Sequence, residues 1–581
     1  MSVEQGQKRI RLSDGKYLNP FIEKLLARRG ICGKDEIQQF LEPKLKELPS
    51  PFLLKDMDLA VNLIEETITN GHPILVWGDY DVDGTTATAL LLLFFKSIGY
   101  TADYHIPNRL TDGYGIQKDG LRKVSENRDT DKCLLITVDN GISAHEAVEY
   151  AKKLGYKVII TDHHLALPER VMADAVINPN QTNCEFLDKT LAGVGVAFYL
   201  AMATRTHLLK CGYFDTINKP PNLKQFLDLV AIGTIADMVP LKKINRIMVK
   251  AGMETIGDQK NHGITALCHL NNLDPKCIRS EDVSFQLAPK INAAGRMGEA
   301  DKAIKLFLSL NKKEAFAIAK DLVESNDKRK LINIKDFISA KDNLLRQGTN
   351  TKHSIIVAGN YHVGVAGIVA SNLVEEYQKP SVVLCDLGEG VLKGSARSVV
   401  GIDIFKALDN CREVLLGFGG HEMAGGMSLL KGNLMNFKKL FDESIQKQSN
   451  RTPENSDNQI DDDIEINDLF NGEILRQLHL MEPFGTDNPQ PIFRDRSTEF
   501  LKVLPLGRDK SHLRFNFRGE RHTIEGVGFG MGKLIEHCRL SKERDILYTP
   551  SINFFKGKRS WQVRVTKIVF NNDNIPDSQH N

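Results

Sequence analysis

The stretch "ILVWGDYDVDG", residues Ile74 to Gly84, joins a short apolar run to three acids at alternate positions. Asp79, Asp81 and Asp83 lie within five residues of one another. Carboxylates this close repel one another unless a proton or a cation intervenes. Taken alone, the stretch fits a solvated turn, a calcium loop or one wall of a catalytic metal site.

The same pattern recurs downstream. The apolar run "CLLITVDNG" ends at Asp139, "KVIITDHH" ends at Asp162, His163 and His164, and "GTIADMVP" carries Asp237. Helical patterns separate these runs, and strands that alternate with helices predict a parallel α/β sheet. Ligands of such sheets bind at the carboxyl ends of the strands. We therefore expect these acids and histidines to meet at one edge of the sheet.

The simpler interpretations fit less well. An EF-hand loop that begins at Asp79 needs Glu at its twelfth position, where this chain has Leu90, and it follows a helix rather than a strand. Alone, "VDNG" fits an Asx turn and "DHH" fits a helix cap. Three successive strand ends with ligand-type residues favour a metal centre instead.

The ligand types indicate the metal. Carboxylates with a few imidazoles suit Mn²⁺ or Mg²⁺, whereas zinc more often brings cysteine or three histidines. Two such ions about 3.5–4 Å apart would offset the repulsion and hold both oxygens of an in-line phosphoryl displacement.

Bulk composition indicates a globular chain of several domains. It has 581 residues, 26% charged and 41% hydrophobic, with a net charge of +2, so any nucleic-acid site must be local. Nine scattered cysteines without a CxxC pair, and an N-terminus without an apolar signal core, predict a cytoplasmic protein that does not enter a membrane.

Several motifs carry a family resemblance. "DYDVDG", "TVDNG", "TDHH" and "GTIADMVPL" resemble the successive motifs of the DHH phosphoesterase superfamily. "IPNRLTDGYG", "APKINAAGRMG", "GSARS", "GFGGHEMAGG" and "MEPFGTDNPQPIF" resemble its RecJ branch, which comprises single-strand-specific 5′→3′ DNA exonucleases. The resemblance covers about residues 50–570.

Composition and resemblance together predict the domain order. The fold class is α/β: a parallel-sheet DHH catalytic domain, a smaller α/β DHH-associated domain joined to it by a long helix, and a C-terminal OB-like β-barrel. The expected segments are an N-terminal extension (1–50), the catalytic domain (51–310), a connecting helix (311–347), the associated domain (348–448), an acidic linker (449–470), the OB-like domain (471–572) and a tail (573–581).

The resemblance implies roles for the residues of the metal centre. The expected metal ligands are Asp81, Asp83, Asp139, His163 and Asp237, with Asp139 bridging two ions and also acting in catalysis. His164 would contact the scissile phosphate. Many relatives have a ligating histidine where this chain has Trp77, so either one ion is held more weakly or Asp79 replaces the imidazole.

A second set of residues is expected to bind the DNA end. An arginine fork suits a terminal phosphate, and the resemblance implies a 5′-phosphate pocket that faces the metals. Its candidates are Arg109, Arg296, Ser395, Arg397 and His421.

The C-terminal region is locally basic. Residues 501–570 hold fifteen Lys and Arg against six Asp and Glu, an excess of +9. Short alternating runs there predict strands, and Phe515 and Trp561 are candidates for stacking against bases.

The predicted function is single-stranded-DNA-specific 5′→3′ exonuclease activity by two-metal phosphodiester hydrolysis. The resemblance implies work in DNA repair and recombination with a helicase and a single-strand-binding protein. We expect the chain to be a monomer. Two alternatives stay open: a phosphodiesterase of short oligonucleotides or cyclic dinucleotides, and a RecJ-like DNA-binding scaffold without catalysis.

Overall fold

The computed structural model describes residues 10–126, 128–166, 169–215, 219–347, 351–388, 390–449, 460–496, 498–519, 523–540, 544–555 and 558–570. Two compact units make up the chain. One holds residues 49–239 and 251–455; the other holds residues 1–48, 240–250 and 456–581. The larger unit contains the predicted metal centre and is described first.

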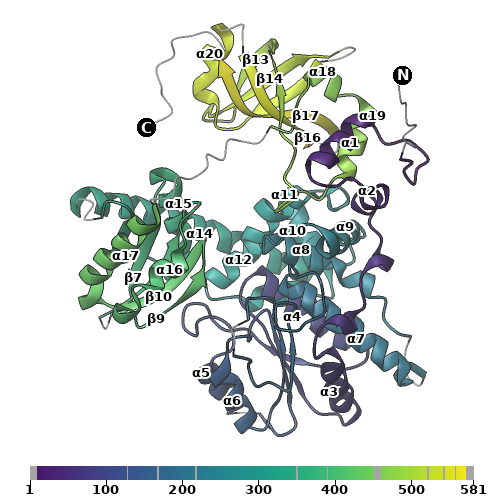
Figure 1. The fold of residues 1–581 in the computed structure, drawn as a ribbon, viewed down its shortest axis with the longest axis vertical. Helices are drawn as coiled ribbons and strands as arrows, with labels where there is room; N and C mark the ends of the chain where they lie inside the picture. The colour runs from purple at the N-terminus through teal and green to yellow at the C-terminus, as the bar shows by residue number, and fades with distance from the viewer. Residues whose placement is uncertain are drawn as a thin grey trace, which may run out of the picture. The chain divides into compact units, whose positions relative to one another are not determined.

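A parallel five-stranded sheet organises the first part of the larger unit (Figure 1). In spatial order its strands are β2 (Asp103–His105), β1 (Ile74–Trp77), β3 (Leu134–Val138), β4 (Lys157–Thr161) and β5 (Ala175–Ile177). The chain runs from β1 to β2 on one side and from β3 to β4 on the other. The order therefore reverses between β1 and β3, the place where open α/β sheets bind ligands.

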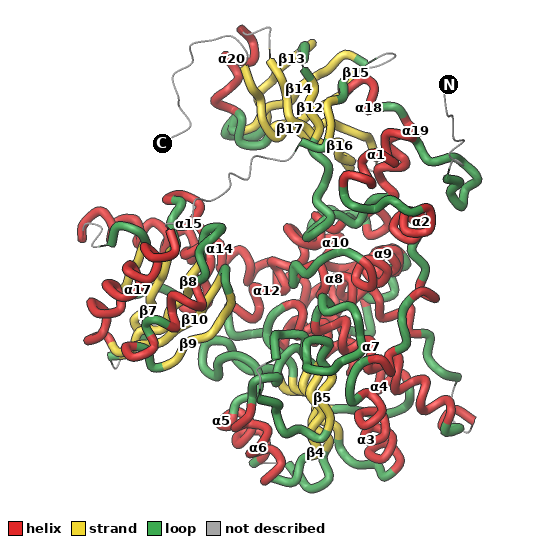
Figure 2. The backbone as a smooth tube through the Cα atoms, in the orientation of Figure 1, coloured by secondary structure: helices red, strands yellow, loops and turns green. Residues whose placement is uncertain are grey.

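Helices cover both faces of this sheet (Figure 2). On one face, α5 (Lys118–Ser125) and α6 (His145–Lys153) share a hydrophobic cluster with the strands. The other helices that pack on this sheet are α3 (Met57–Thr69), α4 (Val82–Ser97) and α7 (Gly193–Lys210). Strands buried on both faces read as continuous apolar runs, which is why "ILVW" and "LLITV" do not alternate.

The rest of the first part is helical. It comprises α8 (Leu227–Ala236), α9 (Lys243–Gly257), whose first eight residues belong to the smaller unit, α10 (His262–Leu270), α11 (Ser280–Asp282), a π-helical turn (Val283–Leu287), α12 (Ala288–Arg296) and α13 (Asp301–Leu308). The 36-residue helix α14 (Lys312–Gln347) follows, as the long connecting helix of the predicted fold class requires.

A second, mixed sheet completes the larger unit. Its order is β6 (Ile355–Gly359), β7 (Ser381–Asp386), β8 (Val391–Arg397), β10 (Ala424–Leu430) and β9 (Gly417–His421), with only β6 and β7 parallel. Helix α15 (Val363–Tyr377) packs on one face, and α16 (Ile404–Asp409) and α17 (Leu434–Ser449) pack on the other. This is the smaller α/β domain that the sequence predicts.

The smaller unit is built on a seven-stranded sheet. Its order is β11 (Asp462–Asp463), β12 (Phe493–Asp495), β16 (Arg544–Phe555), β17 (Lys558–Phe570), β15 (Thr523–Gly528), β14 (His512–Arg518) and β13 (Phe500–Leu506). Its helices are α1 (Pro20–Arg28), α2 (Lys34–Leu41), α18 (Ile466–Leu469), α19 (Gly472–Leu480) and α20 (Ile535–Leu540).

This unit corrects two expectations about segments. The N-terminal residues do not form a separate extension, because Leu25 and Leu26 share one hydrophobic core with Phe493 and Phe515. The linker prediction is wrong for residues 460–470, which form β11 and α18 and bury Ile466 and Leu469. Residues 450–459 and the tail lie outside the described residues.

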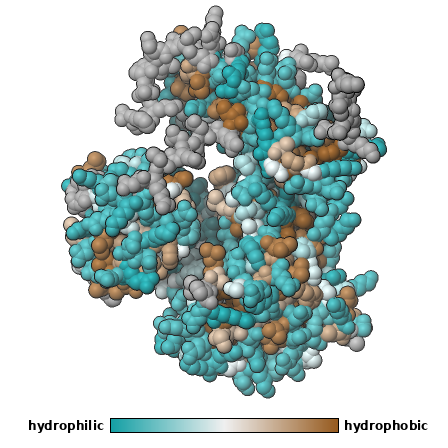
Figure 3. Space-filling model, in the orientation of Figure 1, coloured by the Kyte–Doolittle hydropathy of each residue, from teal (hydrophilic) through white to brown (hydrophobic). Residues whose placement is uncertain are grey.

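Polar side chains dominate the face shown in Figure 3, and hydrophobic residues occur there in small separate groups. None of the helices among the described residues combines the length and the apolar character needed to cross a membrane.

Candidate active site

Acids and histidines from four segments meet beyond the carboxyl ends of β1, β3 and β4. Asp79 and Asp81 follow β1, and Asp139 follows β3. The possible ligand atoms form three groups, each within 4.8 Å: Asp79, Asp81 and Asp139; Asp83, His163 and Asp237; Asp139, His163 and His164. The five expected metal ligands and Asp79 thus belong to one connected cluster, and Asp139 is common to two of the groups.

Local backbone structure explains how the first acids are held. Asp81 is the N-cap of α4, and its carboxylate accepts from the Gly84 backbone N–H at 3.0 Å. A Cβ on Gly84 would lie 2.7 Å from Asp79, so only glycine lets the turn fold this tightly. Asp139 has a φ of 62°, a left-handed conformation that is uncommon outside glycine and recurs at functional sites.

The N-terminus of α7 supports the same cluster. The Gly193 and Val194 N–H groups donate to the Asp83 carboxylate at 2.6 and 2.8 Å. A Cβ on Gly193 would lie 2.6 Å from Asp139, so glycine is needed for this approach as well. These two hydrogen bonds and the positive end of the helix dipole favour the carboxylate form of Asp83, against the effect of burial.

The cluster is electrostatically incomplete by itself. Asp79 Oδ2, Asp139 Oδ1 and His163 Nε2 are buried without a hydrogen-bond partner. Burial, and then the neighbouring acids, raise the pKa of Asp79 and Asp139 well above the usual range and that of Asp83 to about 7. The same causes raise the pKa of Asp237 to about 9. Carboxylates arranged in this way fit divalent cations, which replace the missing positive charge.

His163 has the protonation state that a metal ligand needs. Its Nε2 lies 3.2 Å from Asp139 Oδ1, 3.6 Å from Asp237 Oδ2 and 3.8 Å from Asp83 Oδ2. Burial, and then the charge of His164, lower the pKa of His163 to about 4. The imidazole is therefore neutral near pH 7, with a free nitrogen lone pair available to a metal.

Trp77 is part of the protein core. It is 1% exposed, its ring lies 4.2 Å from that of His105, and it belongs to the cluster with Leu121 on the face covered by α5 and α6. Asp79 instead brings a ligand atom next to those of Asp81 and Asp139. The geometry therefore favours the alternative in which Asp79 takes the place of the missing imidazole.

His164 is oriented by its own neighbours. Its Nδ1 lies 2.7 Å from Asp162 Oδ1, and the Tyr114 hydroxyl lies 3.3 Å from the same ring while it donates to the Asp139 carbonyl at 2.8 Å. Burial opposes protonation, but the hydrogen bond to Asp162 and nearby acids raise the pKa of His164 to about 9. His164 is therefore a cation beside the carboxylates.

A group of partly buried arginines lies in the same unit. Arg296 is at the end of α12, its Nη1 donates to the Gly364 carbonyl at 3.1 Å, and a Cβ on Gly364 would lie 2.1 Å from the Arg296 carbonyl. Burial, then Arg109, Arg397 and Arg329, lower the pKa of Arg296 to about 9. Burial and then Arg109 also lower the pKa of Arg397. Like charges thus repel one another here, and among the described residues Arg296 and Arg397 form no ion pair.

Arg109 connects the arginine cluster to the metal centre. The Arg109 guanidinium lies 4.9 Å from the centre of the Tyr80 ring. Tyr80 lies between Asp79 and Asp81 in the chain. The charge of Arg109 lowers the pKa of Asp79, against the stronger effect of burial. The positive cluster therefore lies next to the negative one.

The remaining predicted contacts come from the second sheet. Ser395 and Arg397 lie on one face of β8, because strand residues alternate, and Arg397 packs against Gly367 of α15. His421 ends β9, and burial, then the charges of Arg397 and His164, lower its pKa. Arg109, which acts on Asp79, and His421, on which His164 acts, thus lie close enough to the metal centre to interact with it electrostatically.

Comparison with known protein families covers three parts of the chain. Residues 73–234 match the DHH family N-terminal domain, residues 351–447 match the DHHA1 domain and residues 460–567 match the RecJ OB domain.

Curated relatives match nearly the whole chain. The single-stranded-DNA-specific exonuclease RecJ of Salmonella typhimurium is 34% identical over 95% of this chain and 96% of its own. The protein of the same name from Bacillus subtilis is 33% identical over 95% of this chain and 68% of its own. The chain belongs to the RecJ family.

Solved structures agree with this assignment. RecJ of Thermus thermophilus in complex with Mn²⁺ matches with a TM-score of 0.77 and 28% identity, covering 96% of this chain and 76% of that chain. An exonuclease RecJ bound to manganese matches with a TM-score of 0.57 and 32% identity, covering 70% of this chain and 96% of that one. With its carboxylate cluster and DHH domain, this RecJ-family chain is a metal-dependent nuclease that uses Mn²⁺ or Mg²⁺.

Three residues of the site were not singled out from their sequence patterns. Tyr80 and Tyr114 contact the arginine and histidine sides of the cluster, and Arg329 of α14 lies near Arg296. Both tyrosines lie inside the quoted motifs "DYDVDG" and "DGYG", which was a usable signal. Arg329 occurs in a charged helix, where sequence offers no means of telling it from its neighbours.

The RecJ-type OB domain corrects one predicted contact. Phe515 is fully buried, and its ring lies 4.9 Å from that of Phe500 in the core, so the prediction that Phe515 stacks on bases is wrong. Trp561 is partly buried and packs against the same core. Phe529, from "GVGFGMG", is 57% exposed, and Arg564 and His512 lie beside its ring.

Proposed function

We propose that this RecJ-family chain removes nucleotides from the 5′ end of single-stranded DNA by two-metal phosphodiester hydrolysis, in DNA repair and recombination. The observation that carries the proposal is the adjacency of two partly buried clusters of opposite charge in one unit. A strand end bound there would place its terminal phosphate on the arginines and its next phosphodiester at the carboxylates.

The carboxylate side would hold two Mn²⁺ or Mg²⁺ ions. Its proposed ligands are Asp79, Asp81, Asp83, Asp139, His163 and Asp237, with Asp139 shared between the ions. When bound, such ions lower the pKa of water and stabilise the charge that develops on phosphate oxygens. His164, held as a cation by Asp162, would donate a hydrogen bond to the scissile phosphate, and Tyr114 would fix the orientation of that imidazole.

The arginine side would set the register of the cut. Arg109, Arg296 and Arg397 supply planar donors that match phosphate oxygens, and Ser395 adds a hydroxyl from the same face of β8 as Arg397. His421 would approach the strand from the glycine-rich β9 end. Because a terminal phosphate offers more oxygens and charge than an internal one, this pocket would select an end over the middle of a strand.

Digestion of end-labelled DNA tests the proposal. A long single strand labelled at its 5′ phosphate should release labelled mononucleotide from the first turnover with Mn²⁺ or Mg²⁺, whereas a 3′ label should stay on long products. A fully duplex substrate of the same sequence should persist. Release of the 3′ label first, or equal cutting of the duplex, would contradict the proposed polarity or strand specificity.

The two alternatives make different predictions in the same assay. A phosphodiesterase of short oligonucleotides or cyclic dinucleotides would cleave a dinucleotide faster than the long strand. A non-catalytic scaffold would bind the strand and leave it intact at every metal concentration. The presence of all six clustered ligand residues favours catalysis over the scaffold.

Further parts of the proposal concern the cellular setting. We infer that the protein acts in the cytoplasm as a monomer, on strands that a helicase exposes and a single-strand-binding protein covers. Sedimentation of the full chain at micromolar concentration should give one species of 65.0 kDa. Digestion of a duplex should begin only when a helicase unwinds it.

A further inference from the structure

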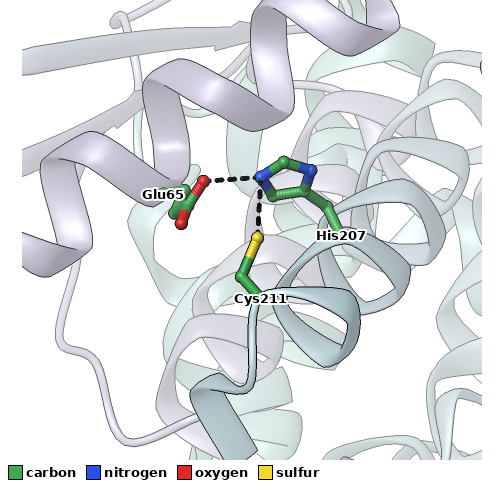
Figure 4. Close-up of side chains that lie close together, drawn as sticks. All are labelled: Glu65, His207 and Cys211. Carbon is green, nitrogen blue, oxygen red and sulfur yellow. Dashed lines mark hydrogen bonds and ion pairs between the residues drawn. The ribbon is translucent and has the colours of Figure 1, made fainter.

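A second cluster of metal-type side chains lies on the surface of the catalytic part, away from the acids at the strand ends. Figure 4 shows Glu65 of α3 facing His207, near the end of α7, and Cys211, the C-cap of α7. Glu65 Oε2 lies 2.6 Å from His207 Nε2, and Cys211 Sγ lies 3.6 Å from the same nitrogen. One potential ligand atom from each residue lies within 4.8 Å of the others.

The chemistry of this cluster differs from that of the catalytic centre. The centre offers carboxylates and imidazoles, which suit Mn²⁺ and Mg²⁺. Glu65, His207 and Cys211 offer one oxygen, one nitrogen and one sulfur, and a sulfur ligand favours zinc over the harder ions. We propose that these three residues bind a Zn²⁺ ion, with a fourth position left open to water.

The helix spacing supports this site. His207 and Cys211 are four residues apart, so both side chains project from one side of the end of α7. Around a tetrahedral zinc, with bonds of about 2.0–2.3 Å, neighbouring nitrogen and sulfur ligands lie roughly 3.6 Å apart and nitrogen and oxygen roughly 3.4 Å apart. The His207–Cys211 distance already has this value, and Glu65 needs to retreat by less than one ångström.

Exposure of the side chains gives an ion access to them. His207 is 19% exposed and Glu65 35% exposed, and Cys211 is also exposed, so an ion can reach the site from solvent. An occupied site would fasten α3 to the end of α7. The other end of α7 supplies the amides that hold Asp83, so the ion would stabilise the helix on which the catalytic centre depends.

Cobalt spectroscopy of the full chain tests the site. Co²⁺ replaces Zn²⁺ in tetrahedral sites, and a thiolate–Co²⁺ bond gives a near-ultraviolet charge-transfer band that carboxylate and imidazole ligands do not give. We expect chelator-treated protein, with Mg²⁺ added in excess, to develop this band as one equivalent of Co²⁺ binds, and to lose it when Zn²⁺ is added. Cys211→Ser should abolish the band and His207→Ala should reduce Co²⁺ affinity at least tenfold.

A matched control separates the cluster from other thiols and from the nuclease site. Cys32→Ser removes another exposed cysteine and should keep the full band. Cys211→Ser should keep Mn²⁺-dependent nuclease activity while its melting temperature stops responding to Zn²⁺. Absence of the band from the unmodified chain, or its persistence in Cys211→Ser, would overturn the proposal.

Discussion

The metal centre and the arginine cluster are opposite in charge, but each brings like charges together away from water without enough opposite charge to balance them. In the centre, buried acids raise one another's pKa, and three of its polar atoms lack a partner. In the arginine cluster, Arg296 and Arg397 have lowered pKa values because they are buried beside other arginines. Each cluster opposes folding unless something of opposite charge joins it.

The difference between them lies in what can complete each one. The acids are arranged in overlapping groups that share Asp139, which suits small ions at fixed positions. The arginines are planar donors that come from separate segments of the unit, which suits a larger anion with several oxygens. Under the proposed function, metal ions would complete the acid cluster and the substrate would complete the arginine cluster.

Removal of the shared acid should have the largest effect. Asp139→Ala takes a possible ligand from two of the three groups, and we expect nuclease activity to fall on the order of 10⁴-fold, the scale found for single members of a catalytic unit. Affinity for single-stranded DNA in the absence of metal should not fall. The matched control is Asp119→Ala, which removes an exposed acid of α5 and should be neutral. Retained Mn²⁺-dependent activity in Asp139→Ala would refute the assignment of the centre.

The smaller unit contains a buried arginine, Arg246, that lets us ask whether every buried arginine of this protein binds substrate. The Arg246 guanidinium donates to the carbonyls of Phe40, Leu480 and Glu482 at 2.7–3.1 Å and lies 3.7 Å from the Phe40 ring centre. Its donors are already matched by the protein. We expect Arg246→Met to cost about 3 kcal/mol of unfolding free energy, because several buried carbonyls lose their donor.

Denaturant unfolding of the full chain measures this cost. The KM of Arg246→Met for single-stranded DNA should stay unchanged at a temperature where the variant is folded. A rise in KM without loss of stability would mean that Arg246 contacts the substrate, as proposed for Arg296 and Arg397. It would contradict the separation of structural from substrate-binding arginines.

Arg397 should give the reverse result. Arg397→Ala removes one donor of the proposed 5′-phosphate pocket, and we expect kcat/KM for a 5′-phosphorylated strand to fall about 10–100-fold, since hydrogen bonds to charged groups contribute about 1.5–3 kcal/mol. Stability should stay equal or rise, because like-charge repulsion is relieved.

The control for Arg397 is another arginine of the same domain. Arg412 is 72% exposed and pairs with Asp409, so Arg412→Ala should leave kcat/KM unchanged. The comparison of strands with 5′ phosphate and 5′ hydroxyl is the decisive readout. If Arg397→Ala lowers kcat/KM equally for both strands, Arg397 does not bind the terminal phosphate.

Sequence predicted the acid side of the site more fully than the arginine side. Acids directly after apolar strands must lie at the carboxyl edge of a parallel sheet, so Asp79, Asp139 and His163 could be grouped from pattern alone. Arg109, Arg296 and Arg397 lie in three separate segments with no periodic relation. Only the family resemblance joined them, because their proximity depends on how α12 packs against α15.

Long-range packing also explains the errors about segments. Residues 10–48 and 460–470 are polar enough to pass for an extension and a linker, yet each contributes a few apolar side chains to a core built mainly from distant strands. Phe515 was an avoidable error. In "HLRFNFR", Leu513, Phe515 and Phe517 share one face of the strand, and their alternation with polar residues marks that face as core.

Substitution of Phe529 should have the smallest effect of the four. Phe529 represents a third kind of binding surface, an exposed aromatic ring, beside the two charged clusters. Its ring is more than half exposed beside Arg564, in the basic OB domain, so it can stack on a base without charge that must be matched. We expect Phe529→Ala to weaken binding of long single-stranded DNA about tenfold, while cleavage of a short 5′-phosphorylated strand is unchanged. Phe515→Ala should instead lower stability, because that ring fills the core. Equal loss on short and long strands in Phe529→Ala would mean that this surface acts through the catalytic part rather than by holding the strand.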